Sequence, residues 1–204
     1  QMLQESVQKF VQKSYDFDTR RQIIAGEKGF SQENWDLFAE LGWLTVPFKG
    51  EDGGFGGSAV DLAVMMEEFG KAMLVEPFIA GAVLSGGVIS EQGSAQQKAE
   101  LLPKIMEGKL QLACAYAEPG SRFNLAHIKT SAIVTGDTVV LNGSKTAVLN
   151  GSNAEILLVV ARESGAATDR EGISVFMVDA ASTGVTIQAF ANVDGKKSAE
   201  ISLK

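Results

Sequence analysis

The stretches Leu112-Ala-Cys-Ala-Tyr-Ala-Glu-Pro-Gly120 and Leu141-Asn-Gly-Ser-Lys-Thr-Ala-Val-Leu-Asn-Gly151 decide how this chain folds. Each contains a short apolar run and ends in a dipeptide typical of tight turns, Pro-Gly in the first and Asn-Gly in the second. We therefore predict that both stretches are strands that run into a turn.

The residue pattern around these two stretches is typical of a β domain. After Leu110 short apolar runs alternate with Gly, Asn, Asp and Ser. Short strands at near-regular spacing are typical of an antiparallel barrel or a sandwich. We expect strands over residues 112–117, 128–134, 139–142, 155–161, 173–178, 185–190 and 199–203.

Residues 1–110 are patterned as helices. Leu3, Val7 and Phe10 recur at helical spacing, and a second apolar pattern predicts a helix over residues 32–41. The run over residues 78–89 has almost no polar residue, which predicts a buried helix. The chain is thus predicted to be an α+β protein, with a helical domain over 1–110 and a β domain over 111–204.

Two helix starts in this half carry their own signals. Ser58 precedes an acidic residue three positions later, and Ser94 precedes Gln97, so both are candidate capping boxes. Pro103 lies inside the helical pattern that follows Ser94, where its ring opposes a continuous helix. We expect either one helix or two short turns there.

Composition excludes several classes of partner. With 45% hydrophobic and 21% charged residues, the chain of 204 residues is typical of a globular protein. A net charge of −7 disfavours nucleic acids and anionic membranes as partners. No apolar run reaches the ~18 residues of a membrane span, and the first residues do not resemble a signal peptide. Cys114, the single cysteine, fits a reducing cytoplasm, and we interpret it as a small strand residue.

Four motifs in order along the chain resemble those of the acyl-CoA dehydrogenases. They are Leu41–Pro47 with Glu51–Gly57, Gln97–Lys104, Glu118–Gly120, and Asn142–Lys145 with Asn150-Gly151. The resemblance covers nearly the whole chain. It implies a helical domain followed by a small antiparallel β-barrel, with the C-terminal helical domain of the family absent from these residues.

The resemblance also implies the chemistry. Members of this family use FAD to desaturate an acyl-CoA thioester, removing a proton from Cα and passing a hydride from Cβ to the flavin. It places the cofactor at Cys114, Tyr116, Ala117, Ala147 and Leu149 and the substrate at Phe123. Arg122 is the second candidate substrate residue, since it either contacts a phosphate of CoA or FAD or is a solvated loop charge. The family passes electrons to an external acceptor and forms dimers and tetramers, so we expect a homo- or hetero-oligomer.

Several flavin-facing side chains depart from the family pattern. A threonine before Glu118 is Ala117 here, a stacking tryptophan is Ala147, and a second threonine is Leu149. The family serine that meets the substrate falls at Phe123. These losses favour a specialised or heteromeric enzyme that needs a partner chain or a further domain for its catalytic base. The alternatives are a non-catalytic structural or binding subunit and, with the same fold, an acyl-CoA oxidase or a flavin-dependent monooxygenase.

Single residues add little to this assignment. Glu118 is interpreted as a brace for the turn before Pro119 and not as a base. His127 has no partner at triad spacing and is interpreted as a surface residue. The glycine cluster over residues 53–57 lacks the lysine of a phosphate-binding loop, and no His, Cys or acidic residues have metal-ligand spacing.

Overall fold

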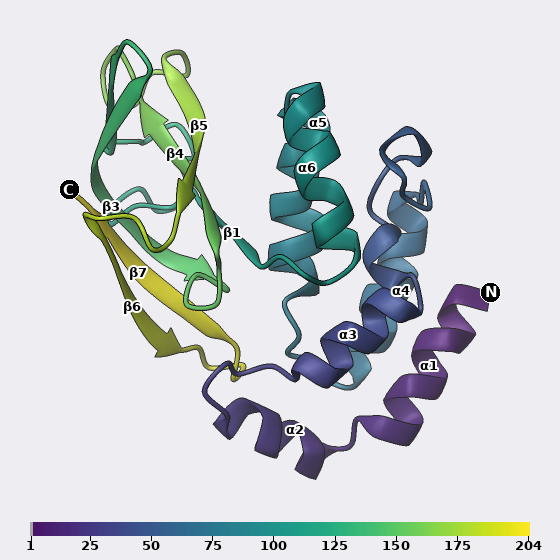
Figure 1. Ribbon diagram of the computed structural model, residues 1–204. Helices are drawn as coiled ribbons and strands as arrows, with labels where there is room; N and C mark the ends of the chain where they lie inside the picture. Colours follow the sequence, from purple (N-terminus) through teal and green to yellow (C-terminus); the bar gives the residue numbers. More distant parts are fainter. Residues whose placement is uncertain (1) are drawn as a thin grey trace. The chain divides into compact units, whose positions relative to one another are not determined.

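A computed structural model describes residues 2–204, which divide into two compact units. The first unit runs to Leu110 and also includes Val193–Lys196. The second contains Gln111–Asn192 and Lys197–Lys204. Figure 1 shows that the first unit is helical and the second is a curled sheet.

The helical unit contains α-helices and short helices of other types. The α-helices are α1 (Met2–Ser14), α2 (Phe17–Ala25), α3 (Gln32–Glu40), α4 (Ala59–Lys71), α5 (Gly86–Gln92) and α6 (Ala95–Met106). Two 3-10 helices, η1 (Trp43–Thr45) and η2 (Gly50–Asp52), and a π-helix, η3 (Phe78–Ser85), complete it. Both predicted capping boxes form, with Ser58 and Asp61 at α4 and Ser94 and Gln97 at α6. None of the helices in the described part of the chain is long and apolar enough to cross a membrane.

Two helices differ from the sequence expectation. The pattern did not predict α2, which starts where Asp16 accepts a hydrogen bond from the Thr19 amide at 2.7 Å and buries only Arg20. Pro103 lies inside α6 without interrupting it. Leu102 and Ile105, on either side of this proline, are each 1% exposed, so burial of the apolar face outweighs the missing hydrogen bond.

The core of the helical unit is aromatic. Phe38 lies 4.8 Å from Trp43 and stacks on Phe69 with an interplanar angle of 11°. Trp35 is also buried, and its ring lies 6.3 Å from that of Phe38. These large side chains join α3, η1 and α4 through one continuous apolar cluster.

A buried carboxylate lies beside this core. Glu76 is 3% exposed, and its Oε1 accepts a hydrogen bond from Asn34 Nδ2 at 2.7 Å. Its Oε2 has no hydrogen-bond partner in the described structure. Burial raises the pKa of Glu76, although Asn34 and Tyr15 oppose the shift by hydrogen bonding. The Tyr15 hydroxyl also accepts from the Val75 amide at 3.1 Å.

The β unit is one curled sheet of seven strands (Figure 1). The strands are β1 (Leu112–Ala115), β2 (Ser131–Thr135), β3 (Thr138–Leu149), β4 (Ile156–Arg162), β5 (Ile173–Asp179), β6 (Val185–Ala191) and β7 (Lys197–Leu203). They pair in the order β1-β4-β2-β3-β7-β6, and β5 pairs with β4. The predicted fold class, helices followed by a small β domain, is confirmed.

The sheet is mixed and not wholly antiparallel. β1 pairs with β4 in parallel, with Leu112 opposite Ile156 and Ala115 opposite Val159. Parallel strands need a long crossover, and here the β2–β3 hairpin lies within it. β2 also pairs with β4 in parallel, with Ser131 opposite Arg162, so the sequence expectation of an antiparallel domain holds for most pairs and fails for these two.

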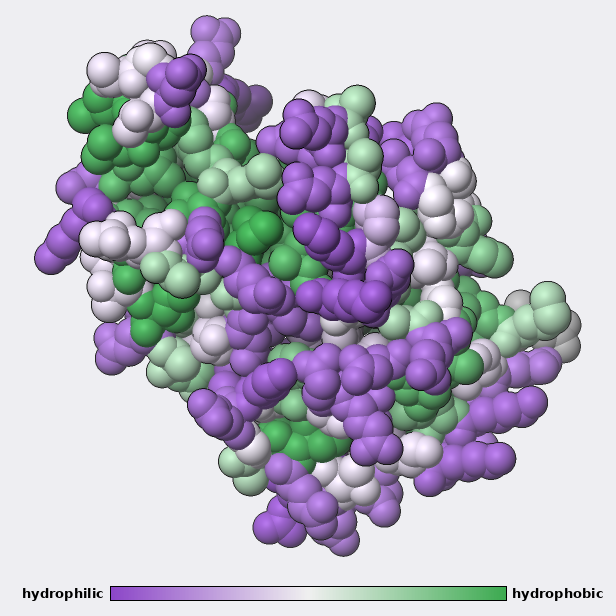
Figure 2. All heavy atoms as spheres, viewed as in Figure 1, coloured by the Kyte–Doolittle hydropathy of each residue, from purple (hydrophilic) through white to green (hydrophobic). Residues whose placement is uncertain are grey.

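The inner side of the sheet is packed with small and branched residues, among them Leu157, Ala199 and Ile201. Hydrophobic residues also reach the surface, and Figure 2 shows them in green over the upper strands of the β unit. On the β2–β3 hairpin four of them are exposed: Ile133, Val134, Val139 and Val140.

Candidate functional site

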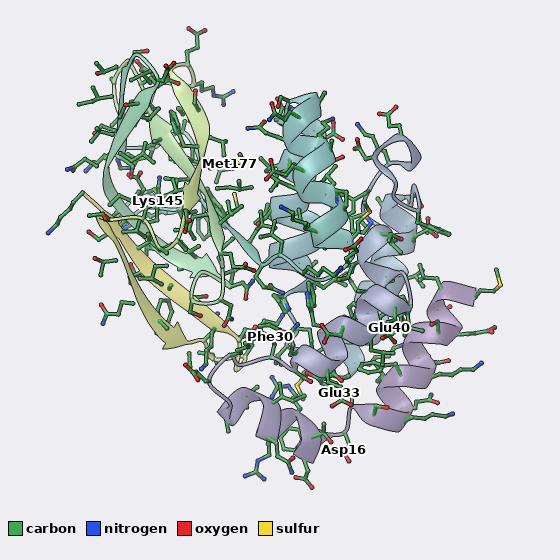
Figure 3. All side chains as sticks on the ribbon, in the orientation of Figure 1. Asp16, Phe30, Glu33, Glu40, Lys145 and Met177 are labelled. Carbon is green, nitrogen blue, oxygen red and sulfur yellow. The ribbon has the colours of Figure 1, made fainter. Side chains whose placement is uncertain are left out.

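A buried ion pair joins the two stretches that the sequence marked as decisive. Lys145 Nζ, on β3, lies 2.6 Å from Glu118 Oε1, in the turn after β1. The side chains are 0% and 5% exposed, and Lys145 is labelled within the β unit in Figure 3. Because both charges are removed from water, the pair fixes the spacing of the two segments only while both partners remain.

Glu118 is fully engaged by its surroundings. Besides Lys145, it accepts hydrogen bonds from the amides of Lys129 at 2.7 Å and Thr130 at 3.0 Å. Burial raises the pKa of this carboxyl, but the hydrogen bonds from Lys145, Thr130 and Lys129 outweigh burial and hold the pKa below its usual range. Burial lowers the pKa of Lys145, and Glu118 opposes that shift. A carboxylate that is ionised and accepts three hydrogen bonds is a poor proton acceptor. Glu118 therefore braces the turn, as predicted from the sequence.

The main chain connects the same two segments directly. The Thr146 amide donates to the Ala117 carbonyl oxygen at 2.9 Å. Between Lys145 and Val148 the register of β3 against β7 shifts in a bulge, where Ala147 adopts a φ of 51°. Glu200 Oε1 accepts from Thr146 Oγ1 at 2.7 Å and from the Ala147 amide at 3.3 Å, which supports the bulge from β7. Bulges re-aim side chains, and this one turns Ala147 outward.

The far end of β3 is tied back to the start of β1. Asn150 adopts a φ of 61°, a conformation that asparagine tolerates well. Its Nδ2 donates to Gln111 Oε1 at 3.0 Å and to the Leu112 carbonyl oxygen at 3.3 Å. The Asn-Gly turn predicted from the sequence therefore fixes where β3 ends relative to β1.

Four uncharged residues at least partly exposed lie beside these links, and we call them the shelf: Tyr116, Ala117, Ala147 and Leu149. Ala115 and Val148 belong to the β-unit core, so their outward neighbours point away from it. Tyr116 is 39% exposed and Leu149 38% exposed. No shelf residue carries a charge. A flat, apolar ring could lie on such a surface with its edge toward main-chain groups.

Cys114 behaves differently from the other four predicted cofactor residues. It is 8% exposed, and burial raises the pKa of its thiol. A buried, protonated thiol is inert, in agreement with its interpretation as a small strand residue. Ala113 and Ala115 on either side of it pack in the β-unit core, so the Cys114 side chain points to the other face of β1, where it is nearly covered.

The two predicted substrate residues lie on the loop that follows Glu118. The amide and side chain of Ser121 bond Glu118, so the loop starts from a fixed point. Arg122 adopts a φ of 49° and is exposed, and Phe123 is fully exposed at 100%. A bare phenyl ring on a tethered loop is suited to contacting another molecule.

Glu118 was recognisable in the sequence, but its partners were not. Lys145 lies within the quoted motif, and the signal that could have found it is strand alternation, which points it inward with Val148 after the bulge. Glu200 gave no such signal. Within residues 2–204, no group of His, Cys, Asp and Glu side chains could hold a metal ion.

Two family models match the chain. The N-terminal domain model of the acyl-CoA dehydrogenases matches residues 1–109, and the middle domain model matches residues 113–204. Among curated relatives, acyl-CoA dehydrogenase FadE26 of Mycobacterium tuberculosis is 30% identical over 79% of this chain and 42% of its own length. The mitochondrial long-chain specific acyl-CoA dehydrogenase of Sus scrofa is 30% identical over 100% of this chain and 46% of its own length.

A solved structure of the same family is also similar to this chain. The steroid ACAD Tcur3481-Tcur3483, as its G363A variant, superposes with a TM-score of 0.88 at 25% identity, over 100% of this chain and 54% of its own. The chain therefore spans about half the length of the proteins that it matches.

Proposed function

The chain belongs to the acyl-CoA dehydrogenase family, and we propose that it supplies the flavin-facing part of an FAD-dependent enzyme that desaturates an acyl-CoA thioester. The proposal includes a cytoplasmic location and an external electron acceptor. It rests on one observation, the shelf formed where the Glu118–Lys145 pair and the Thr146–Ala117 hydrogen bond hold two strand ends together.

The shelf fits the flavin ring in its apolar character and differs from the family in its donors. Of the five predicted cofactor residues, only Cys114 and Tyr116 carry a side-chain donor, and Cys114 is buried. Ala117 and Leu149 cannot donate from their side chains, so main-chain amides must supply those hydrogen bonds. Each missing side-chain hydrogen bond weakens binding by about 1 kcal/mol.

When bound, FAD supplies the acceptor for the hydride that leaves the substrate. The residues of this chain have supporting tasks. Tyr116 and Leu149 exclude water from one side of the ring, while the Glu118–Lys145 pair keeps the two strand ends at a fixed separation. Arg122 and Phe123 lie on the loop beside them, where we place the contact with acyl-CoA.

We assign the catalytic base to a partner chain or to a domain outside these 204 residues. Glu118 is unsuited to the task because Lys145 and two main-chain amides already occupy its oxygens. The similar steroid ACAD carries the double designation Tcur3481-Tcur3483, which supports a heteromeric assembly here. A bulky acyl-CoA ester is the substrate class that this analogy favours.

FAD titration followed by visible absorption tests this assignment. We expect the chain alone to bind FAD weakly and the double variant Ala147→Trp/Leu149→Thr to bind about tenfold or more tightly. A stacked aromatic ring adds about 0.5–1.5 kcal/mol and a hydroxyl donor about 1 kcal/mol.

The matched control is Val139→Trp/Val140→Thr, at two exposed positions of the same strand away from the shelf. If both double variants change FAD affinity equally, the shelf is not the flavin site. Co-expression with a partner that carries the family's intact threonine, tryptophan and glutamate should raise bound flavin towards stoichiometric amounts.

The lost donors favour one second candidate, a non-catalytic subunit of such an enzyme. It predicts that this chain binds no FAD, either as the shelf double variant or when co-expressed with the partner. It also predicts that the partner retains full activity when Tyr116 is replaced by Ala. The same titration and an activity assay of the complex separate the two.

A further inference from the structure

We propose that Arg162 is a positioning residue, which fixes the loop over residues 119–128 and thereby sets where Arg122 and Phe123 meet acyl-CoA. This inference rests on the proposed function for the identity of the ligand. Its structural part, the attachment of the loop, rests on the hydrogen bonds of the Arg162 side chain and on the main-chain hydrogen bonds beside them.

Arg162 is an unusual buried cation. It is 8% exposed at the end of β4, and all of its hydrogen bonds in the described structure go to main-chain carbonyl oxygens. A buried charge is normally paired with an opposite charge. Here the partial negative charges of carbonyl oxygens take the place of a carboxylate partner. The guanidinium is stabilised only while the loops that carry these oxygens stay in place.

The carbonyl groups come from two loops. On the loop over residues 119–128, which we call the substrate-side loop, Nη2 donates to the carbonyl oxygen of Ala126 at 3.0 Å and Nε donates to that of Ile128 at 3.0 Å. On the loop between β4 and β5, the other contacts are to Ser164 at 3.2 Å, Ala167 at 3.3 Å, Asp169 at 2.8 Å and Glu171 at 2.9 Å. One planar guanidinium therefore joins two segments far apart in sequence.

Main-chain hydrogen bonds extend the same connection. The Ile128 amide donates to the Ala167 carbonyl oxygen at 2.9 Å, and the Arg162 amide donates to Thr130 at 2.8 Å. The start of the substrate-side loop is held by Glu118 and Ser121, as described above. Fixed at both ends, the loop exposes Phe123 at its tip.

Lysine cannot replace this arrangement. Its ammonium has three donors on a flexible stem, whereas the guanidinium has five in a rigid plane. Arg162→Lys therefore keeps the charge and loses the geometry. Arg170→Lys is the matched control, because Arg170 is exposed on the same β4–β5 loop.

The first measurement is amide hydrogen exchange resolved by peptide. We expect Arg162→Lys to raise exchange about tenfold or more in residues 121–128 and 163–172, since each lost hydrogen bond is worth up to about a factor of ten. β7 should stay unchanged, as should all segments in Arg170→Lys. Uniform acceleration throughout the β unit, or no acceleration in 121–128, would overturn the inference.

The second measurement uses the complete enzyme with its partner. Arg162→Lys should raise KM for acyl-CoA about tenfold while flavin content and the flavin spectrum stay at the wild-type values. A looser loop with an unchanged KM would show that Arg162 holds the loop without positioning substrate. If the wild-type enzyme binds no acyl-CoA, the proposed function is wrong, and Arg162 then has no role in positioning that substrate. The hydrogen-exchange result still decides whether Arg162 holds the loop.

Discussion

Both units of the molecule bury glutamates, and two of them, Glu118 and Glu76, lie in opposite electrostatic environments. Glu118 in the β unit is 5% exposed and lies against Lys145 and two amides. Glu76 in the helical unit is 3% exposed and receives its hydrogen bonds from the neutral groups of Asn34 and Tyr15. The pKa of Glu118 is held low, and the pKa of Glu76 is raised by burial.

The difference shows that burial alone does not decide the state of a carboxyl group; its partners do. Glu118 is held as an anion and locks two strand ends together. Glu76 is held toward its neutral form, with one oxygen lacking a partner. Three predictions test this contrast, beginning with the largest effect.

The largest effect is expected from removing the cation beside Glu118. Lys145→Met leaves a buried carboxylate without its counter-charge, so the β unit should lose about 3–5 kcal/mol of stability. Urea unfolding with segment-resolved amide exchange at β1 and β3 measures the loss. Glu118→Gln/Lys145→Met should recover most of it, and a double variant as unstable as the single one would contradict the ion-pair interpretation.

A smaller effect is expected from removing the neutral partner of Glu76. Asn34→Ala leaves a buried acceptor unsatisfied and should cost the helical unit about 1–3 kcal/mol. Gln22→Ala, at an exposed position of α2, is the control and should be close to neutral. A loss from Asn34→Ala no larger than that of the control would mean that Glu76 obtains its stabilisation elsewhere.

The smallest and most specific effect is an opposite pH dependence in the two units. The lowered pKa of Glu118 means that its stabilisation is present above the ordinary value of 4.5 and is lost as pH falls. The raised pKa of Glu76 means that the folded helical unit holds a proton that the unfolded chain releases above 4.5, so its stability falls as pH rises.

Proteolysis in urea between about pH 2.5 and pH 8, with an acid-active protease in the lower part of the range and fragments assigned by mass, would resolve the two units. Glu76→Gln should remove the slope of the helical unit and leave that of the β unit. Parallel slopes in both units, or a slope that survives Glu76→Gln, would break the comparison.

Local signals in the sequence predicted much of the fold. The capping boxes at Ser58 and Ser94 could be recognised because all of their partners lie within four residues. α2 escaped because it has no apolar stripe, only the cap at Asp16. The effect of Pro103 was underdetermined, since tertiary burial of its neighbours decided that α6 continues.

The candidate site was only partly visible in the sequence. Its segments were recognisable from motifs, but the pairing of Glu118 with Lys145 spans 27 positions and depends on how the strands associate. The role of Arg162 was hidden because its partners are carbonyl groups, which every residue possesses. Whether the predicted cofactor and substrate residues bind these ligands stays a prediction.

The aromatic core of the helical unit has a practical consequence. Both tryptophans of the chain, Trp35 and Trp43, are buried there, and the β unit has none. Intrinsic tryptophan emission is therefore an optical reporter of one half of the molecule. A variant with an unfolded β unit could show a native emission spectrum. Fluorescence alone would then report a folded protein although the candidate site had already been lost.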